Sequence, residues 1–317
     1  YQIFKTNYSK IYTDLDVFYS FFNNYCVTIT GTNGKSTTAK LLHDVLRDQK
    51  KDVRLVGNIG NPVLSEKKIT KKTFFVIEAS SYQLDYSKIF KSKYSVILNI
   101  TPDHIERHKS FKNYIDAKFS LLNSQTKQSV AFIKLNDPVI NKKLRKKKYK
   151  QKIIKINTST TPKLFEKISN NYFLSFGNRE NLIFVLKICQ ILKIKREKIL
   201  KTINKFKGLK YRQQIIFDNS YLSIINDSKS TSLASSENLL KNHKSVYWIL
   251  CGIPKRGDKF NLTKSQCKNF KVYIIGNYYK QFNKNFKNKL ATKKFDNLKH
   301  TLDPIFREIK TIKEKTY

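Results

Sequence analysis

One segment near the start of the chain constrains the fold most strongly, because it joins an apolar strand to an amphipathic helix through a glycine-containing loop. Residues 25–30 form a short apolar run that predicts a buried strand. From Ser36 to Gln49, apolar residues recur at helical spacing and predict a helix. The loop between them has the sequence GTNGKS. A strand, a glycine loop and a helix in this order favour an α/β fold.

The rest of the chain extends this pattern. Further strands are expected at 74–78, 94–98 and 129–133, with helical patterns at 111–123 and 180–192. Strands that alternate with helices predict a mostly parallel sheet covered on both faces.

A second series of strands follows Gly208, which divides the chain into a central domain at 25–207 and a smaller Rossmann-like α/β domain at 208–317. The strands of this second series are expected at 221–226, 246–251 and 271–275. A hinge is expected at 203–214, and the Lys- and Asn-rich stretch 277–299 carries no structural prediction.

The loop at residues 31–36 has the chemistry of a phosphate-binding loop. Glycines let backbone amides approach phosphate oxygens, and the following helix N-terminus adds positive potential. Lys35 is expected to contact the β- and γ-phosphates, and the Ser36 hydroxyl to ligate magnesium. The general P-loop pattern would require a glycine at position 29, which is Ile29, so this loop is a variant.

Charge raises a competing interpretation, since 63 basic residues against 23 acidic ones give a net charge of +40. Such an excess is typical of proteins that bind nucleic acid or anionic membranes. We favour compositional drift instead, because Lys, Asn, Ile, Phe and Tyr are all abundant and no nucleic-acid-binding motif accompanies the charge. Phosphate-rich substrates would still be attracted.

Other features of composition narrow the setting. No apolar run is long enough to span a membrane and no signal peptide is evident, so we expect a cytoplasmic protein. The four cysteines form no CxxC pair, which indicates neither a zinc site nor a disulfide framework, and Cys26, Cys189 and Cys251 are expected in the core. The chain begins at Tyr1 and contains no methionine, which favours a fragment.

The phosphate loop and four later stretches together resemble the Mur ligases. The octapeptide TGTNGKST at 30–37 is similar to the loop shared by Mur ligases and folate-type polyglutamate ligases, and Ser36 favours the Mur side. Four further stretches follow in the order found in the Mur ligases that add D-glutamate: GNIGNP at 57–62, EASSYQL at 78–84, NITPDHIERH at 99–108 and YIDAK at 114–118.

This resemblance implies an enzyme that uses ATP and Mg²⁺ to form an acyl phosphate and then an amide. Two anions must meet in such a reaction, so cations have to neutralise their charge. By resemblance, Glu78 ligates one magnesium ion and His104 a second, Ser36 also ligates magnesium, and Lys118 is carbamylated so that it becomes an anionic metal ligand. Lys35, Glu78, His104 and Lys118 are the expected catalytic residues.

The resemblance also assigns contacts to the substrates. The residues expected to bind ATP are Gly31, Thr32, Asn33, Gly34, Lys35, Ser36, Thr37, Asn181, Arg212, Asp227 and Lys229. Those expected to contact the other substrates are Asn58, Ser81, Gln83, Thr231 and Lys255.

Departures from the family pattern put the adenine contact in doubt. Glu180 stands for the usual His and Phe184 for the usual second Asn, and Phe184 is expected to stack on the base or wall it instead. Near the hinge, Tyr211 and Gln214 also depart, and Cys251 replaces a glycine.

The partners that the resemblance implies are a UDP-sugar peptide precursor and D-glutamate, bound by a monomer. Residues 1–24 would then be the remnant of an N-terminal UDP-binding domain, and the second domain would be incomplete. Three alternatives stay open: another Mur or folate-type ligase, a non-catalytic basic protein that binds nucleotides or nucleic acid, and a decayed copy.

Overall fold

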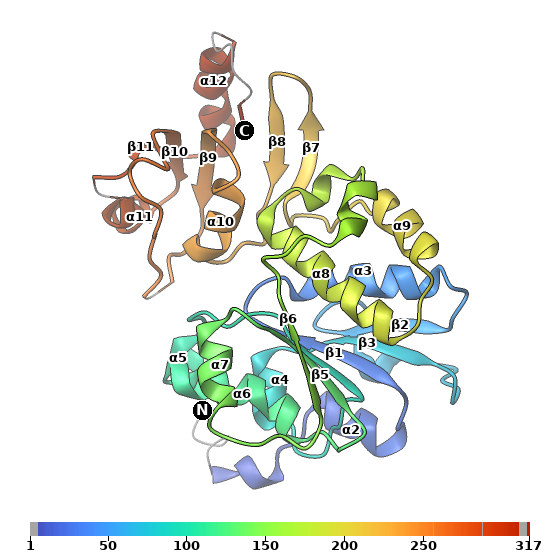
Figure 1. Ribbon diagram of the computed structural model, residues 1–317. Helices are drawn as coiled ribbons and strands as arrows, with labels where there is room; N and C mark the ends of the chain where they lie inside the picture. The colour runs from blue at the N-terminus through green and yellow to red at the C-terminus, as the bar shows by residue number, and fades with distance from the viewer. Residues whose placement is uncertain (1–5, 256, 287, 311–315) are drawn as a thin grey trace. The chain divides into compact units, whose positions relative to one another are not determined.

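The computed structural model describes residues 6–255, 257–286, 288–310 and 316–317 (Figure 1). The chain divides into two compact units, which part between Lys207 and Gly208. The first unit contains the residues up to Leu174 and Asn178–Lys207. The second contains Ser175–Gly177 and the residues from Gly208 onward.

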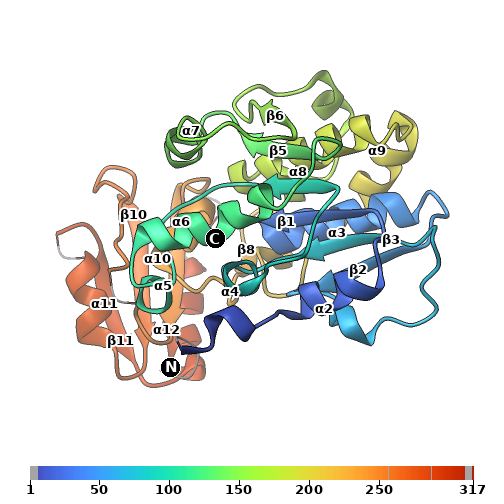
Figure 2. The same ribbon diagram turned by 90° about the horizontal axis from the view of Figure 1, so that it is seen from below.

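A parallel sheet of six strands forms the centre of the first unit, with the strand order β2-β3-β1-β4-β5-β6. The edge strands β2 and β6 lie on opposite sides of the sheet (Figure 2). The strands are β1 (Cys26–Thr30), β2 (Val53–Gly57), β3 (Phe74–Glu78), β4 (Tyr94–Ile97), β5 (Val130–Lys134) and β6 (Lys152–Ile156).

Helices cover both faces of this sheet (Figure 1), which confirms the predicted architecture. One face packs against α3 (Lys35–Arg47), α8 (Phe176–Ile191) and α9 (Arg196–Lys205). The other packs against α2 (Asp14–Phe21), α4 (Ser81–Tyr86), α6 (Phe111–Asn123) and α7 (Pro138–Leu144), and a short α5 (Ile105–His108) precedes α6.

Alternation along the strands builds the two cores. In β3, Val76 joins the core under α3 and α8, whereas Phe75 and Ile77 join the core under α4 and α6. Successive side chains of a strand point to opposite faces, so a strand buried on both sides is apolar throughout. This is why 25–30 and 74–78 read as continuous apolar runs in the sequence.

The second unit has a parallel three-stranded sheet in the order β11-β10-β9. Its strands are β9 (Ser245–Cys251), β10 (Asn269–Ile275) and β11 (Ala291–Phe295), and its helices are α10 (Leu233–Leu240), α11 (Tyr279–Phe286) and α12 (Leu298–Ile309). Phe260, Phe270 and Phe286 are buried in its core with Trp248 packed against them. The stretch 277–299, for which the sequence predicted nothing, therefore contains α11 and β11 and the start of α12.

The expected strand at 221–226 does not join that parallel sheet. It begins at Ser223 as β8 (Ser223–Asn226) and pairs antiparallel with β7 (Gln214–Asp218) as a separate hairpin, with a bulge between Ile215 and Phe217. A period-two pattern identifies a strand but not its neighbour, so the sequence could not distinguish these pairings. Residues 316–317 pair with both sheets, since Ser223 N donates to Thr316 O and Tyr247 N donates to Tyr317 O.

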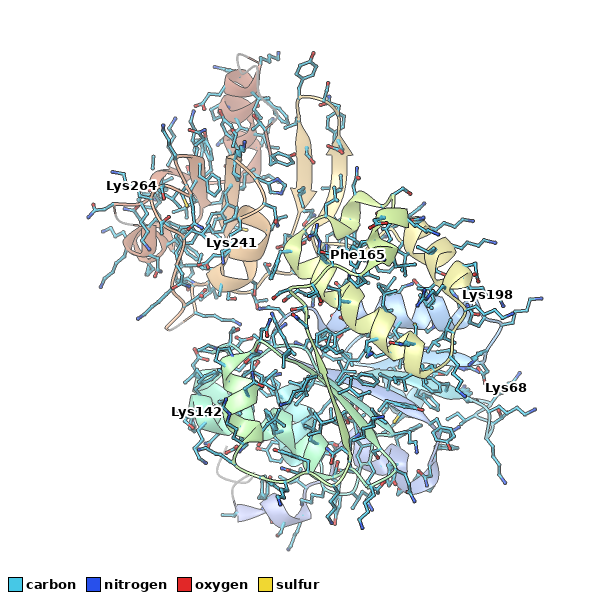
Figure 3. All side chains as sticks on the ribbon, viewed as in Figure 1. Lys68, Lys142, Phe165, Lys198, Lys241 and Lys264 are labelled. Atoms are coloured by element: carbon cyan, nitrogen blue, oxygen red, sulfur yellow. The ribbon has the colours of Figure 1, made fainter. Side chains whose placement is uncertain are left out.

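Two further observations concern the surface and the cysteines. Exposed lysines such as Lys68, Lys142 and Lys198 project from well-separated parts of the first unit (Figure 3). Cys26 and Cys189 are buried as expected, but Cys251 is exposed, because β9 ends there and the chain leaves the sheet. Among the described helices, none has the length and apolar character needed to cross a bilayer.

A buried carboxylate fixes the loop that connects α4 to β4. Asp16 in α2 is fully buried and accepts hydrogen bonds from the amides of Lys88, Ile89 and Phe90 at 2.9–3.1 Å. It also accepts from Ser87 Oγ at 2.9 Å. Burial alone would raise the pKa of Asp16, but hydrogen bonds from the amides of Thr13, Phe90 and Ile89 and from Ser87 Oγ hold that pKa below its usual value.

We therefore expect Asp16→Asn to destabilise the chain by about 2–4 kcal/mol at pH 7, because the amide group presents a donor to donors. The pKa is lower in the folded state than in the unfolded state, so the charged carboxylate stabilises the fold above about pH 4, and this contribution is lost as the pH falls further. Urea unfolding at pH 7 and pH 3.5 measures both effects. Equal stability losses in Asp16→Asn and in the exposed-site control Glu197→Gln would contradict this role.

Candidate active site

The carboxyl ends of the adjacent strands β3, β1 and β4 carry predicted site residues of the first unit. β1 lies between β3 and β4, so Gly31, Glu78 and Asn99 follow or end neighbouring parallel strands. The connection after β1 leads toward β2 at one edge of the sheet, whereas the connection after its neighbour β4 leads toward β5 and the opposite edge, and open α/β sheets bind ligands at such a point. The loop after β1 connects directly to α3.

Two glycines allow the loop to adopt its path. Gly34 has φ +84° and immediately precedes α3, and a Cβ there would come within 2.1 Å of Asn181 Oδ1. Gly31 has φ +152°, and a Cβ there would lie 3.1 Å from Leu98 Cβ. L side chains rarely adopt such backbone conformations. The close approach at Gly34 places Asn181 of α8, an expected ATP contact, directly against the loop.

Lys35 folds back over its own loop. Its Nζ donates to Gly31 O at 3.0 Å and to Thr32 O at 2.9 Å. Ser36 and Thr37 are buried and lie in the first turn of α3. The helical hydrogen bonds begin with the next residue, where Thr38 N donates to Gly34 O. Amides in the first turn of a helix have no intrahelical acceptor, so those of Ser36 and Thr37 are suited to an anion.

Lys118 lies beneath this loop in a buried position. Its side chain is 1% exposed, and Nζ donates to Gly31 O at 2.7 Å while lying 4.6 Å from the centre of the Tyr114 ring. Burial, and then the neighbouring Lys35 charge, hold the pKa of Lys118 well below its ordinary value, although Asp103 and Glu78 act in the opposite direction. The site therefore favours the neutral amine of Lys118, which is the form that reacts with carbon dioxide.

Glu78 ends β3 as a fully buried carboxylate. Its Oε1 accepts a hydrogen bond from Asn58 Nδ2 at 2.8 Å. Its Oε2 is buried and has no hydrogen-bond partner among the residues that the structure describes. A buried carboxylate oxygen without a donor is costly, and a bound cation would satisfy it. Glu78 thus fits the magnesium ion that the resemblance implies.

His104 stands at the start of α5 with φ +53°. Its Nδ1 lies 2.8 Å from Tyr82 Oη, and its Nε2 lies 3.4 Å from Asp103 Oδ2. The His104 and Tyr114 rings are 6.5 Å apart, and Tyr114 Oη lies 3.0 Å from Thr32 Oγ1. Tyr114 therefore connects His104 to the phosphate loop and to Lys118.

No group of three His, Cys, Asp or Glu side chains that could hold a metal occurs among the described residues. The expected metal set contains only two residues of these types, Glu78 and His104. Its other two members are the Ser36 hydroxyl and Lys118, which could ligate a cation only after carbamylation.

The expected substrate residues of the first unit have different surroundings. Asn58 is exposed apart from its bond to Glu78. Ser81 is buried, with Oγ 3.0 Å from Nε2 of His108, whose pKa is lowered to about 4 mainly by burial. Gln83 donates to Asp14 and accepts from Ser80 N as part of the cap of α4. In this structure, Ser81 and Gln83 have contacts that order α4.

In the second unit, the two predicted nucleotide motifs lie next to each other. Asp227 Oδ1 accepts from Gln213 N at 3.0 Å, and Lys229 N donates to Tyr211 O at 3.0 Å. Burial raises the pKa of Asp227, against the hydrogen bonds from Ser230 and Gln213 and the charge of Arg212.

Thr231 and Lys255, the two substrate residues expected in this unit, are also in contact. Lys255 Nζ donates to Thr231 Oγ1 at 3.2 Å. Residues from three separate stretches of the second unit therefore form two small polar groups, one around Asp227 and one around Lys255.

The expectation for Phe184 is wrong. Its side chain is 1% exposed and belongs to the core between α8 and the sheet, so it neither walls nor stacks on a base. Helical spacing alone did not reveal which face of α8 would be buried. Glu180, the other departure in α8, forms an ion pair with Lys134 and accepts from Thr158 Oγ1 at 2.6 Å.

Several residues of the site were not singled out from the sequence. Asn99, Tyr82, Tyr114 and Asp103 all contact the loop or His104. Asn99 carried a usable signal, because it is the first polar residue after the predicted strand 94–98, where ligand-binding residues of α/β sheets gather.

Comparisons with known proteins agree with this geometry. A model of the Mur ligase middle domain matches residues 29–195. The UDP-N-acetylmuramoylalanine--D-glutamate ligase of Rickettsia felis is 32% identical over 316 residues, which cover 94% of this chain and 70% of that protein.

Two solved structures have the same fold. MurF from Acinetobacter baumannii matches with a TM-score of 0.67 and 16% identity over 96% of this chain and 74% of that one. The MurF ligase from Thermotoga maritima, solved in complex with ADP, matches with a TM-score of 0.67 and 13% identity over 95% of this chain and 77% of that one.

The surroundings of Lys118 generate a stability prediction. We expect Lys118→Met to leave the thermal midpoint of the ligand-free chain unchanged or to raise it, because an apolar side chain of similar length removes a buried ionisable group that burial and the Lys35 charge disfavour. Differential scanning calorimetry, with the exposed Lys127→Met as control, measures this. A loss of about 2 kcal/mol or more, as for a core truncation, would refute it.

Proposed function

The chain belongs to the Mur ligase family, and we propose that it joins D-glutamate to UDP-N-acetylmuramoyl-L-alanine in an ATP-dependent reaction of peptidoglycan precursor synthesis. The observation that carries this proposal is the cluster at the carboxyl ends of β1, β3 and β4. There a phosphate loop, a half-satisfied buried carboxylate and a buried lysine with a depressed pKa lie together. The relative from Rickettsia felis, which bears the name of this activity, supports the choice of substrates.

The reaction proceeds in two steps. The lactyl-alanine carboxylate of the UDP-sugar attacks the γ-phosphorus of ATP, which forms an acyl phosphate and releases ADP. The amine of D-glutamate then attacks the acyl carbon to give a tetrahedral intermediate, which loses phosphate and leaves the amide. Both steps bring anions together, so positioning and charge neutralisation are what the protein must supply.

Residues of the phosphate loop hold the nucleotide in this proposal. Lys35 exchanges its present contacts with Gly31 O and Thr32 O for the β- and γ-phosphates. The first-turn amides of α3 bind the same phosphates. Thr32 and Asn33 shape the loop, and Asn181 lies against Gly34 at its far side. Lys35 and these amides act at the phosphates, whereas Asn181 belongs to the stretch that is proposed to hold adenine.

Magnesium neutralises the phosphate charge and polarises the transferring group when it is bound. Ser36, Glu78, His104 and carbamylated Lys118 would hold two such ions, with Glu78 on one and His104 on the second. Carbamylation joins the neutral Lys118 amine to carbon dioxide and releases one proton, so that an anionic carbamate replaces the neutral amine. The depressed pKa of Lys118 favours that reaction, and the unpaired Glu78 Oε2 remains available as a ligand.

The second unit contributes the remaining assignments. Arg212, Asp227 and Lys229 are proposed to contact the nucleotide, with Asp227 at the ribose hydroxyls. Thr231 and Lys255, which hydrogen-bond each other, are proposed to contact the incoming amino acid and the γ-phosphate. Asn58 is proposed to approach the UDP-sugar beside Glu78.

The direct test is a ligation assay that separates this function from its alternatives. We expect release of phosphate from ATP only when UDP-N-acetylmuramoyl-L-alanine and D-glutamate are both present, with L-glutamate and meso-diaminopimelate inactive. Lys35→Ala should reduce turnover by at least about a hundredfold while leaving the fold intact, since it removes a charge from the transferring phosphate.

Other results would favour one of the alternative functions. Turnover with a folate-type acceptor or with another precursor would assign a sibling ligase activity. Salt-sensitive DNA binding by a chain that does not hydrolyse ATP would support a basic nucleic-acid-binding protein instead.

Carbamylation of Lys118 has its own test. We expect Lys118→Ala to lose most turnover and to regain part of it in added acetate, because a small carboxylate can take the vacated ligand position. Turnover at saturating ATP, with and without acetate, measures this, and mass spectrometry in bicarbonate buffer detects the carbamate independently. The exposed Lys127→Ala serves as control. Equal turnover in Lys118→Ala and the parent would leave Lys118 without a catalytic part.

A further inference from the structure

Asn99 makes an arrangement of contacts with the phosphate loop that the function above does not use. It follows β4 and is half-buried. Its Oδ1 accepts from Asn33 N at 2.9 Å, and its Nδ2 donates to Asn33 O at 3.1 Å. Its backbone oxygen accepts from Thr32 N at 2.9 Å. One residue therefore makes three hydrogen bonds to two successive loop residues.

We infer that Asn99 is a positioning residue, which fixes the phosphate loop so that the first-turn amides of α3 and Lys35 face the phosphates of ATP. This inference rests on the proposed function, because it concerns how the same loop holds the nucleotide.

The geometry explains why such a clamp is needed. Asn33 precedes Gly34, which has no Cβ and adopts φ +84°, so the backbone at this point has more freedom than elsewhere. Asn99 holds both the N–H and the C=O of Asn33, which fixes the peptide groups on either side of that residue. The direction in which the following amides point then depends on Asn99 rather than on the nucleotide.

The clamp also selects which amides meet the phosphates. The amides of Thr32 and Asn33 are committed to Asn99. In phosphate loops, amides that point into the loop cradle the anion. Here that task moves to the residues from Gly34 onward, where the helix N-terminus adds its positive potential. A preorganised loop binds a ligand more tightly, since less ordering remains to be done.

Thr32 provides a second connection between the same two segments. Its Oγ1 donates to Thr101 O at 3.1 Å and lies 3.0 Å from Thr101 N, which donates to it. These bonds involve no atom of Asn99, so they still hold the stretch 99–104, which ends at His104, when the Asn99 side chain is changed. Asn58, proposed to approach the UDP-sugar, lies on another loop. A disturbance of Asn99 should therefore affect nucleotide binding first and the UDP-sugar little.

The variants Asn99→Asp and Asn99→Ala separate this role from space filling. Asp keeps the size and the acceptor for Asn33 N, but it has no donor for Asn33 O and places a negative charge beside the phosphates. Ala removes both side-chain bonds. Asn157→Ala is the matched control, because Asn157 follows β6 at the same end of the same sheet. Among the described residues, its hydrogen bonds join it only to Asn136 and to its own turn.

The experiment measures binding of the β,γ-imido analogue of ATP with Mg²⁺, and of UDP-N-acetylmuramoyl-L-alanine, to the full chain by calorimetry. We expect both Asn99 variants to raise the dissociation constant of the nucleotide analogue about tenfold or more, as the loss of hydrogen bonds to a binding loop predicts. Affinity for the UDP-sugar should change less than about threefold. Asn157→Ala should match the parent in both.

A second measurement tests the clamp without any ligand. In the nucleotide-free parent, the Asn33 amide should exchange its hydrogen slowly, and Asn99→Ala should accelerate that exchange. This readout stays decisive if Asn99→Asp fails to fold, provided that Asn99→Ala retains the parent's circular dichroism.

The outcomes separate the inference from the function. Parent-like nucleotide affinity in both variants, or unchanged Asn33 exchange in Asn99→Ala, overturns the positioning role and leaves the proposed function standing. Equal losses of nucleotide and UDP-sugar affinity would reduce Asn99 to a general structural contact and would also overturn it. A parent chain that binds no nucleotide analogue defeats the proposed function itself.

Discussion

The pairing of β1 with both β3 and β4 is the constraint on which the rest of the first unit depends. Parallel strands carry all their carboxyl ends to one edge, so a central strand with two neighbours delivers three loops to one place. From these loops come the phosphate loop, Glu78 and the stretch 99–104. Each strand is buried on both faces, which makes its register hard to change. The positions of the site residues are therefore fixed mainly by the strand register of the sheet and less by the loops themselves.

Two of the residues at this edge of the sheet are expected to lower the stability of the ligand-free fold. Lys118 is a buried amine next to Lys35 whose charged form is disfavoured, and Glu78 is a buried carboxylate with one oxygen that has no hydrogen-bond partner among the described residues. Both arrangements are unfavourable in the ligand-free chain, because burial of charge is offset only by close partners. Anionic nucleotide and a divalent cation would relieve both at once, so part of their binding energy comes from strain that the fold already carries. Functional sites often retain such unfavourable groups, since removing them would remove the chemistry.

Much of the central sheet was predictable, because its signal is local. The apolar runs at 25–30 and 74–78 and the helix at 111–123 correspond closely to β1, β3 and α6. What failed depended on distant partners. The hairpin between β7 and β8 required knowledge of which strand lies beside Ser223–Asn226. Phe184 required knowledge of which face of α8 the sheet covers. Periodicity reports that a residue belongs to an element and does not report what that element packs against.

The positions that depart from the family motif also show that the sequence alone does not reveal what a residue contacts. At some positions where the family pattern has a ligand-binding residue, this chain has a different residue that stabilises the local structure instead. Tyr211 N donates to Gln214 Oε1 at 2.9 Å, so two departures stabilise one turn beside Asp227. Glu180 pairs with Lys134 and Thr158 and connects α8 to the ends of β5 and β6. A position that no longer contacts a ligand directly can still order the residues that do. A departure from the motif is therefore evidence against one particular ligand contact, and it is weaker evidence against the presence of the binding site as a whole.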